Sequence, residues 1–190
     1  MTNRYHPEFV ETVKGSIVNA LHGAGEVASA VVDAISKTVA TTLKGTATVG
    51  TSLVLTISEL VEGIVHAIAE VGGDIGSAAK GIVIGVLRGT KEAGSVTLET
   101  ISHTAGAVIT ATADITGDLG SAAKGLVEGA VDGAKEVGLD TMEAASAAAN
   151  GALKAASDIG SEAGTKVRHA LTGTIAGVTV VLKEPFKKGR

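Results

Sequence analysis

The sequence has no cysteine and no tryptophan, and aromatic residues make up only 2% of it. The absence of cysteine excludes disulfide bonds, thiolate metal sites and cysteine nucleophiles. The three aromatic residues, Tyr5, Phe9 and Phe186, all lie near the ends of the chain. Any interior between them must therefore be built from valine, isoleucine, leucine, alanine and threonine, and such small side chains can fill only a thin core.

The chain also has few prolines and a small net charge. The two prolines, Pro7 and Pro185, leave the stretch between them free of the residue that most strongly breaks helices. The formal net charge of -4 gives no electrostatic reason to expect a nucleic-acid partner. Hydrophobic residues account for 45% of the chain, which is too much for a solvated, disordered polymer. We therefore expect the apolar surface to be covered.

Long apolar runs are missing too. The longest uncharged windows, such as 45–58 and 169–182, have fourteen residues each, fewer than the roughly 20 that a helix needs to cross a bilayer. The first residues carry charge and do not resemble a secretory signal. We expect a cytoplasmic protein, with association with a membrane or granule as the alternative.

A tandem repeat organises the chain. The segment Gly-Asp-Ile-Gly-Ser-Ala-Ala-Lys-Gly at 73–81 returns at 117–125 with one change, Ile75 to Leu119. The offset of 44 residues is four times eleven, and an eleven-residue period corresponds to about 3.67 residues per turn, a helical value. We expect a lead-in at 1–8, a helical repeat region at 9–171 and a tail at 172–190 that is first apolar and then basic. The expected repeats are approximately 29–72, 73–116 and 117–160.

When the sequence is written in rows of eleven residues, three columns of positions contain no charged residue and no glycine. The second column lies four residues after the first, and the third lies three residues after the second. These offsets place the columns within about 70° of arc on a helix, so that they form one apolar stripe. Sustained alternation of apolar and polar residues, which a β-solenoid requires, is missing. The pattern predicts an all-α fold of long amphipathic helices whose central stripe contains Ile64, Ile68, Val71, Ile75, Ile82, Val86, Ile101, Val108, Ile115, Leu119 and Leu126.

Glycines stand beside the stripe. Each glycine inside a helix costs about 1 kcal/mol relative to alanine, so their number requires compensation. Close approach of two helix backbones supplies such compensation. We predict two packing ladders of this kind, Gly81, Gly85 and Gly89, and Gly125, Gly129 and Gly133. Two further glycines precede aspartates, which predicts that Asp74 and Asp118 are helix-starting caps.

Two shapes fit this pattern. An unbroken helix from Pro7 to about Leu171 would be a rod on the order of 240 Å long. Breaks at Gly73 and Gly117 would instead give an antiparallel bundle of helices of about 40 residues each. We favour the bundle, because helical hairpins bury the stripe within one chain.

Motifs of common enzymes are missing from the sequence: there is no Gly-x-Ser-x-Gly elbow, no phosphate-binding loop and no dinucleotide fingerprint. We expect no enzymatic activity, no cofactor and no metal. Acids and histidines occur four residues apart in three pairs, which are either metal sites or parts of solvated faces, and we favour solvated faces: His22/Glu26, Glu62/His66 and Glu99/His103. The same choice, with the same preference for an exposed face, applies to the acidic ridge Glu128, Asp132, Glu136 and Asp140.

The segments Gly-Val-Leu-Arg-Gly-Thr-Lys-Glu-Ala-Gly at 85–94 and Gly-Ala-Val-Asp-Gly-Ala-Lys-Glu-Val-Gly at 129–138 resemble the eleven-residue repeats of synucleins, perilipins and some apolipoproteins. The resemblance covers roughly residues 16–170. It implies a helix that lies on a lipid surface.

Two functions follow from these patterns. The first is a non-enzymatic structural or scaffold protein whose glycine-flanked stripes associate, within the chain and between copies, into a bundle, tube or larger assembly with an apolar interior. A homo-oligomer is the partner this function implies. The alternative is a protein that coats a membrane, lipid droplet or granule. In either case the tail at 172–190 is a candidate docking segment for another protein.

Overall fold

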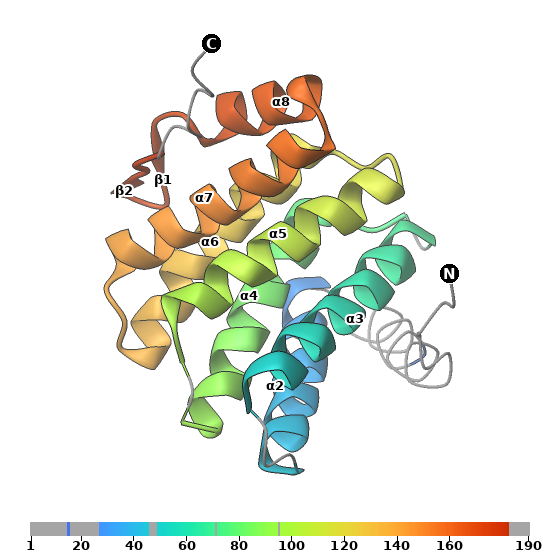
Figure 1. The fold of residues 1–190 in the computed structure, drawn as a ribbon, viewed down its shortest axis with the longest axis vertical. Helices are drawn as coiled ribbons and strands as arrows, with labels where there is room; N and C mark the ends of the chain where they lie inside the picture. Colours follow the sequence, from blue (N-terminus) through green and yellow to red (C-terminus); the bar gives the residue numbers. More distant parts are fainter. Residues whose placement is uncertain (1–14, 16–26, 46–48, 71, 95, 183–190) are drawn as a thin grey trace.

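The computed structural model describes residues 15, 27–45, 49–70, 72–94 and 96–182. Within them the chain forms seven α-helices and one short β-hairpin (Figure 1). The predicted all-α fold is confirmed. The elements are α2 (Val27–Gly45), α3 (Val49–Glu70), α4 (Ile75–Glu92), α5 (Leu98–Asp114), α6 (Leu119–Val137), α7 (Thr141–Ile159), α8 (Ser161–Leu171), β1 (Thr174–Ile175) and β2 (Val178–Thr179).

Consecutive helices form hairpins, and the hairpins stack on one another in two layers. Helices α2, α4, α6 and α8 contact one another in succession in the first layer, and α3, α5 and α7 do so in the second. Figure 1 shows this succession running from α2 to α8 across the molecule. Helices of one layer thus come from different hairpins, and the chain is a bundle of short helices rather than a rod.

The predicted helix length of about 40 residues is wrong, because the helices break in the middle of each expected repeat as well as at its ends. The described helices from α2 to α7 have 17 to 22 residues. The additional breaks lie at Gly94 and Gly138, whose φ angles of 72° and 84° are left-handed and therefore favour glycine. A segment such as 73–116 is one helical hairpin, not one helix.

A cap follows each of these additional breaks. The hydroxyl of Thr97 accepts a hydrogen bond from the backbone N–H of Thr100 at the start of α5. The carboxylate of Asp140 accepts hydrogen bonds from the N–H groups of Met142 and Glu143 at the start of α7. A glycine two or three residues before a capping side chain is a helix stop followed by a start. The hydrophobic period continues in phase through these stops, so the period alone gave no sign of them.

The core between the layers is aliphatic and changes in character along the stack. Around α3 and α4 it consists of larger side chains such as Ile57, Leu60, Ile64 and Ile82, all almost fully buried. Around α7 it consists mainly of alanine, namely Ala144, Ala145, Ala148, Ala149, Ala152 and Ala156. Smaller side chains allow the helix axes to approach more closely, since interhelical distance follows the size of the residues at the contact.

The C-terminal end of the stack is closed by α8 and the hairpin. Val167 and Leu171 of α8 are fully buried against the body, whereas its other face exposes Glu162, Thr165 and Lys166. Strands β1 and β2 pair antiparallel, and β1 contacts α6 while β2 contacts α7. Part of the expected docking tail therefore packs on its own chain.

Some expectations fall outside the described residues: the lead-in at 1–8, Val71, the His22/Glu26 pair and the basic tip from 183 onward. Among the helices that the structure does describe, none combines the length and the apolarity required to cross a membrane.

Candidate binding groove on the second helix layer

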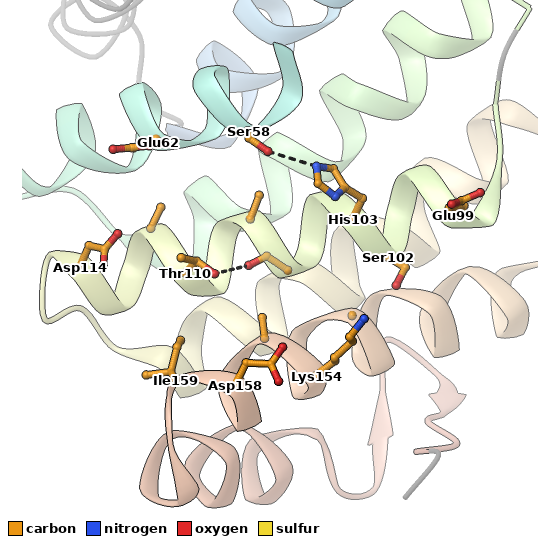
Figure 2. A pocket seen from close by; sticks show the side chains of 15 residues that line it. Ser58, Glu62, Glu99, Ser102, His103, Thr110, Asp114, Lys154, Asp158 and Ile159 are labelled. Atoms are coloured by element: carbon orange, nitrogen blue, oxygen red, sulfur yellow. Dashed lines mark hydrogen bonds between the residues drawn. The ribbon is translucent and has the colours of Figure 1, made fainter. Parts of the chain in front are cut away.

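A surface hollow lies along α5, between α3 and α7. Its volume is about 680 Å³. Figure 2 shows that α5 forms the base of this hollow, which we call the α5 groove, with side chains from α3 on one side and from α7 on the other. The three helices run in the same direction there, so their C-terminal ends meet at one end of the groove.

The floor of the groove is made of small residues. Gly106, Ala107 and Ala111 come from α5, and Gly151 and Ala155 from α7. Packing explains one of the two glycines: a Cβ on Gly151 would collide with the backbone of Ser102. Gly106 differs, because a Cβ there would lie 3.7 Å from the carbonyl oxygen of Gly151 and 3.8 Å from the Cβ of Ala155, which are ordinary contacts. The packing of α5 on α7 does not require a glycine at position 106.

The walls of the groove are acidic. Four carboxylates line it, those of Glu62, Glu99, Asp114 and Asp158, against the single ammonium group of Lys154. Figure 2 shows Glu99 at one end and Asp114 and Glu62 at the other. Within the described part of the chain, Asp114 and Asp158 take part in no salt bridge. The groove therefore favours cationic groups.

A serine and a histidine meet at the α3 wall. The Oγ of Ser58 lies 3.1 Å from Nε2 of His103, and this Nε2 is also 3.2 Å from the carbonyl oxygen of Val54. Since a carbonyl can only accept, the tautomer that satisfies the contact with Val54 is the one with the proton on Nε2, and the Ser58 hydroxyl donates to the same carbonyl over 3.1 Å. A protonated Nε2 cannot take the serine proton, so the pair joins α3 to α5 and does not resemble an activated nucleophile.

The first layer carries the acidic ridge, and basic residues of α4 face most of it. Lys80 lies 2.8 Å from the carboxylate of Asp132 and 4.0 Å from that of Glu128. Arg88 donates two hydrogen bonds to Glu136, of 2.6 and 3.0 Å. The ridge thus links α4 to α6. Lys80 and Arg88 of the same chain offset the negative charge of the ridge, which was the alternative cation site in the sequence analysis.

These pairs shift the pKa values of the ridge. The hydrogen bond from Arg88 lowers the pKa of Glu136, and the same contact raises the pKa of Arg88. The hydrogen bond from Lys80 lowers the pKa of Asp132. The fourth acid, Asp140, serves as the cap of α7.

The residues of the two glycine ladders are all buried, and five of them contact the preceding helix of the first layer. A Cβ on Gly85 would lie 2.8 Å from the Cβ of Ile35, and one on Gly129 would lie 2.5 Å from the carbonyl oxygen of Lys80. Gly89 faces Val39 of α2, while Gly125 and Gly133 face α4. Gly81 is buried in α4. These contacts lie within one chain.

The stacking has a break in register. Gly129 lies over the carbonyl of Lys80, but Gly85, its counterpart 44 residues earlier, lies over that of Val32 and not Ser36. Val32 is four residues, or one helical turn, before Ser36. The α2–α4 contact is therefore shifted by one turn relative to the α4–α6 contact.

The stripe residues face the interior. Apart from Val71, which lies outside the described residues, each of them is buried or half-buried. The buried ones are Ile64, Ile68, Ile82, Val86, Ile101, Val108 and Leu126, and the half-buried ones are Ile75, Ile115 and Leu119. The last three lie near helix ends.

Asp74 and Asp118 precede α4 and α6. Asp74 accepts a hydrogen bond of 2.8 Å from the N–H of Gly76. Asp118 accepts from the N–H groups of Gly120 and Ser121 at 2.9 and 3.1 Å, and from the Ser121 hydroxyl at 2.8 Å. The hydroxyl bond, followed by the backbone bonds, lowers the pKa of Asp118.

The two described acid–histidine pairs, Glu62/His66 and Glu99/His103, do not form one cluster of ligands. Glu62, Glu99 and His103 line the groove, but His66 is not among its lining residues. No group of three or more potential metal ligands occurs in the region that the structure describes.

The sequence did not predict the groove, because its charged residues lie on the polar faces of the helices, which the sequence pattern assigns to solvent. One signal was present. Asp114 and Asp158 stand 44 residues apart and both lie in the last turn of a helix, where negative charge opposes the helix dipole.

By its geometry the chain belongs to the all-helical proteins built of stacked helical hairpins. A scan against protein-family models finds no match, and a search of curated proteins gives none. Among solved structures, the chain is similar to the crystal structure of the de novo designed helical repeat protein DHR7, with 23% identity, a TM-score of 0.48 and coverage of 86% of this chain and 90% of that one.

Proposed function

We propose that this protein is a non-enzymatic scaffold that folds as a single stack of helical hairpins and presents the surface of α3, α5 and α7 to a partner. The observation that carries the proposal is the burial of the apolar stripe inside one chain. Val31, Ile64, Val108 and Ala152, one from each part of the stripe, are 0% exposed. In the described helices, a stripe buried in this way leaves little apolar surface for lipid or for a second copy.

The remaining exposed surface supports the same proposal. In the described residues the large exposed hydrophobic side chains are Val54, Leu55, Met142, Ile159 and Val181, which are distributed over α3, both ends of α7 and the C-terminal segment. Scattered apolar residues are normal on a monomer, whereas interaction sites for lipid or protein form contiguous apolar patches. The polar outer face of α8 also resembles the capping repeats that keep stacked-repeat proteins from associating end to end.

Self-association into a larger assembly and coating of a lipid surface both require the stripe to be available between molecules. The ladder glycines argue against both alternatives, because their close contacts are made with α2 and α4 of the same chain. Either alternative would have to open the stack. The groove would then be lost, since it depends on α3, α5 and α7 lying side by side.

The test combines circular dichroism with light-scattering mass, each with and without vesicles of anionic lipid. The proposal expects a helical spectrum without lipid, a mass near the 18.7 kDa of one chain and no change on adding vesicles. A disordered chain that becomes helical only on vesicles would contradict it in favour of lipid coating. A stable helical oligomer without lipid would contradict it in favour of assembly.

A further inference from the structure

We propose that the α5 groove binds an extended cationic peptide segment that carries lysine or arginine near both ends and no positive charge between them. The inference rests on the proposed scaffold function and deepens it by naming the class of partner. It is carried by three features of the groove: the placement of charge, the open floor at Gly106 and the length of α5.

The charges define where the cations of the peptide lie. One end of the groove has Glu99, and the other has Asp114 and Glu62, while Asp158 lies nearer the middle, beside Lys154. At the second end the C-termini of α5 and α7 add the negative ends of two helix dipoles, and neither helix has a basic residue in its last turn. Lys154 lies between the two ends and would repel a cation there. A peptide that matches this surface has positive ends and an uncharged or acidic centre.

The floor indicates close approach of a backbone. Gly106 lies in the middle of α5, where glycine weakens a helix, although its neighbours leave room for a methyl group. Helix packing explains Gly151 in the same floor but not Gly106. The missing side chain at position 106 is explained if a ligand lies directly on the helix there, since glycine is used where a backbone must approach closely.

The length of the groove selects an extended conformation. The fifteen residues from Glu99 to Asp114 rise by about 22 Å along α5. An extended chain covers that distance in about seven residues, whereas a helical one needs about fifteen. A short extended segment therefore reaches both charged ends while its centre passes over Gly106.

The probe is a fluorescent peptide with two lysines at each end separated by four glycine and serine residues. Fluorescence anisotropy with the full chain at low salt is expected to show saturable binding that weakens as salt is added. Two control peptides, one with glutamate in place of lysine and one with all four lysines in the centre, are expected to bind at least about five-fold more weakly.

Three protein variants locate the site. Asp114→Asn with Asp158→Asn is expected to weaken peptide binding about five-fold. The control, Glu143→Gln with Glu162→Gln, removes the same amount of charge from exposed positions outside the groove and is expected to leave binding nearly unchanged. Gly106→Ala is expected to weaken binding while the melting temperature stays equal or rises, a combination that mere damage to the fold would not give.

The inference is wrong if the lysine peptide does not bind, if the control pair weakens binding as much as the groove pair, or if Gly106→Ala leaves binding unchanged. These failures are distinct from a failure of the scaffold proposal. A chain that is a helical monomer without lipid and does not bind the peptide overturns the inference alone. A chain that is disordered without vesicles overturns the scaffold proposal.

Discussion

At the scale of single residues, one buried side-chain polar atom in the described part of the chain has no partner. The Oγ1 of Thr112 is fully buried and has no hydrogen-bond partner among the described residues. The other fully buried threonines donate to carbonyls of their own helix, as Thr104 does to Thr100 over 2.7 Å. A hydroxyl taken from water without a partner reduces stability.

We therefore expect Thr112→Val to raise the free energy of unfolding by about 1 kcal/mol, because it replaces the unpaired hydroxyl with a methyl group of similar size. Urea denaturation followed by circular dichroism measures the change. Thr104→Val is the matched control, with the same substitution in the same helix, but it removes a satisfied hydrogen bond and should give no gain. Equal effects of the two substitutions would refute the explanation.

The ladder glycines allow a second prediction at this scale. A Cβ at Gly129 would lie 2.5 Å from the carbonyl oxygen and 3.0 Å from the Cα of Lys80, both backbone atoms of α4. Since a backbone cannot rotate away, we expect Gly129→Ala to lower the free energy of unfolding by about 2 kcal/mol, although alanine is the better helix former. Gly106→Ala is the control, and there the substitution should be neutral or stabilising. A stabilising Gly129→Ala would mean that α4 and α6 are farther apart than described.

At the scale of an element, each helix start depends on a cap. Asp118 accepts two backbone N–H groups and the Ser121 hydroxyl at the start of α6, a helix that contacts α4, α7 and α8. We expect Asp118→Ala to cost about 1 kcal/mol at neutral pH, as measured by urea denaturation.

The pH dependence of this cap follows from the lowered pKa of Asp118. An acid with a lower pKa in the folded state stabilises the fold above its unfolded pKa of about 3.9, and the contribution disappears as the pH falls through the folded pKa. The difference between wild type and Asp118→Ala should thus be constant at neutral pH and decrease below about pH 4. Asp118→Asn helps to interpret the result, because it keeps an acceptor without the titration. A difference that persists unchanged at pH 2 would show that charge is not involved.

At the scale of the whole molecule, the stack ends at α8, whose inner face is buried and whose outer face is polar. Deleting 161–190 would uncover the surfaces of α6 and α7 that Val167 and Leu171 now cover. We expect the truncated chain to unfold at a lower temperature and to self-associate, since an uncapped repeat exposes its apolar side. Light scattering and thermal melting measure both effects. A truncated chain that stays monomeric with an unchanged melting temperature would show that α8 is not a cap.

The sequence alone determined the helical class, the apolar stripe and the starts of α4 and α6, because periodicity and capping are local properties of the chain. The stop residues Gly94 and Gly138 are also present in the sequence. The eleven-residue period continues in phase through them, however, so the period does not distinguish one long helix from two short ones.

Only the tertiary structure decided what the stripe contacts. The ladder glycines lie against α2 and α4, and the acidic ridge against Lys80 and Arg88. A periodic pattern specifies which face of a helix is apolar but not which surface covers it. The same physics explains the α5 groove: Glu62, Asp114 and Asp158 are far apart in the sequence, and they line one groove because three hairpins stack with α3, α5 and α7 in one layer.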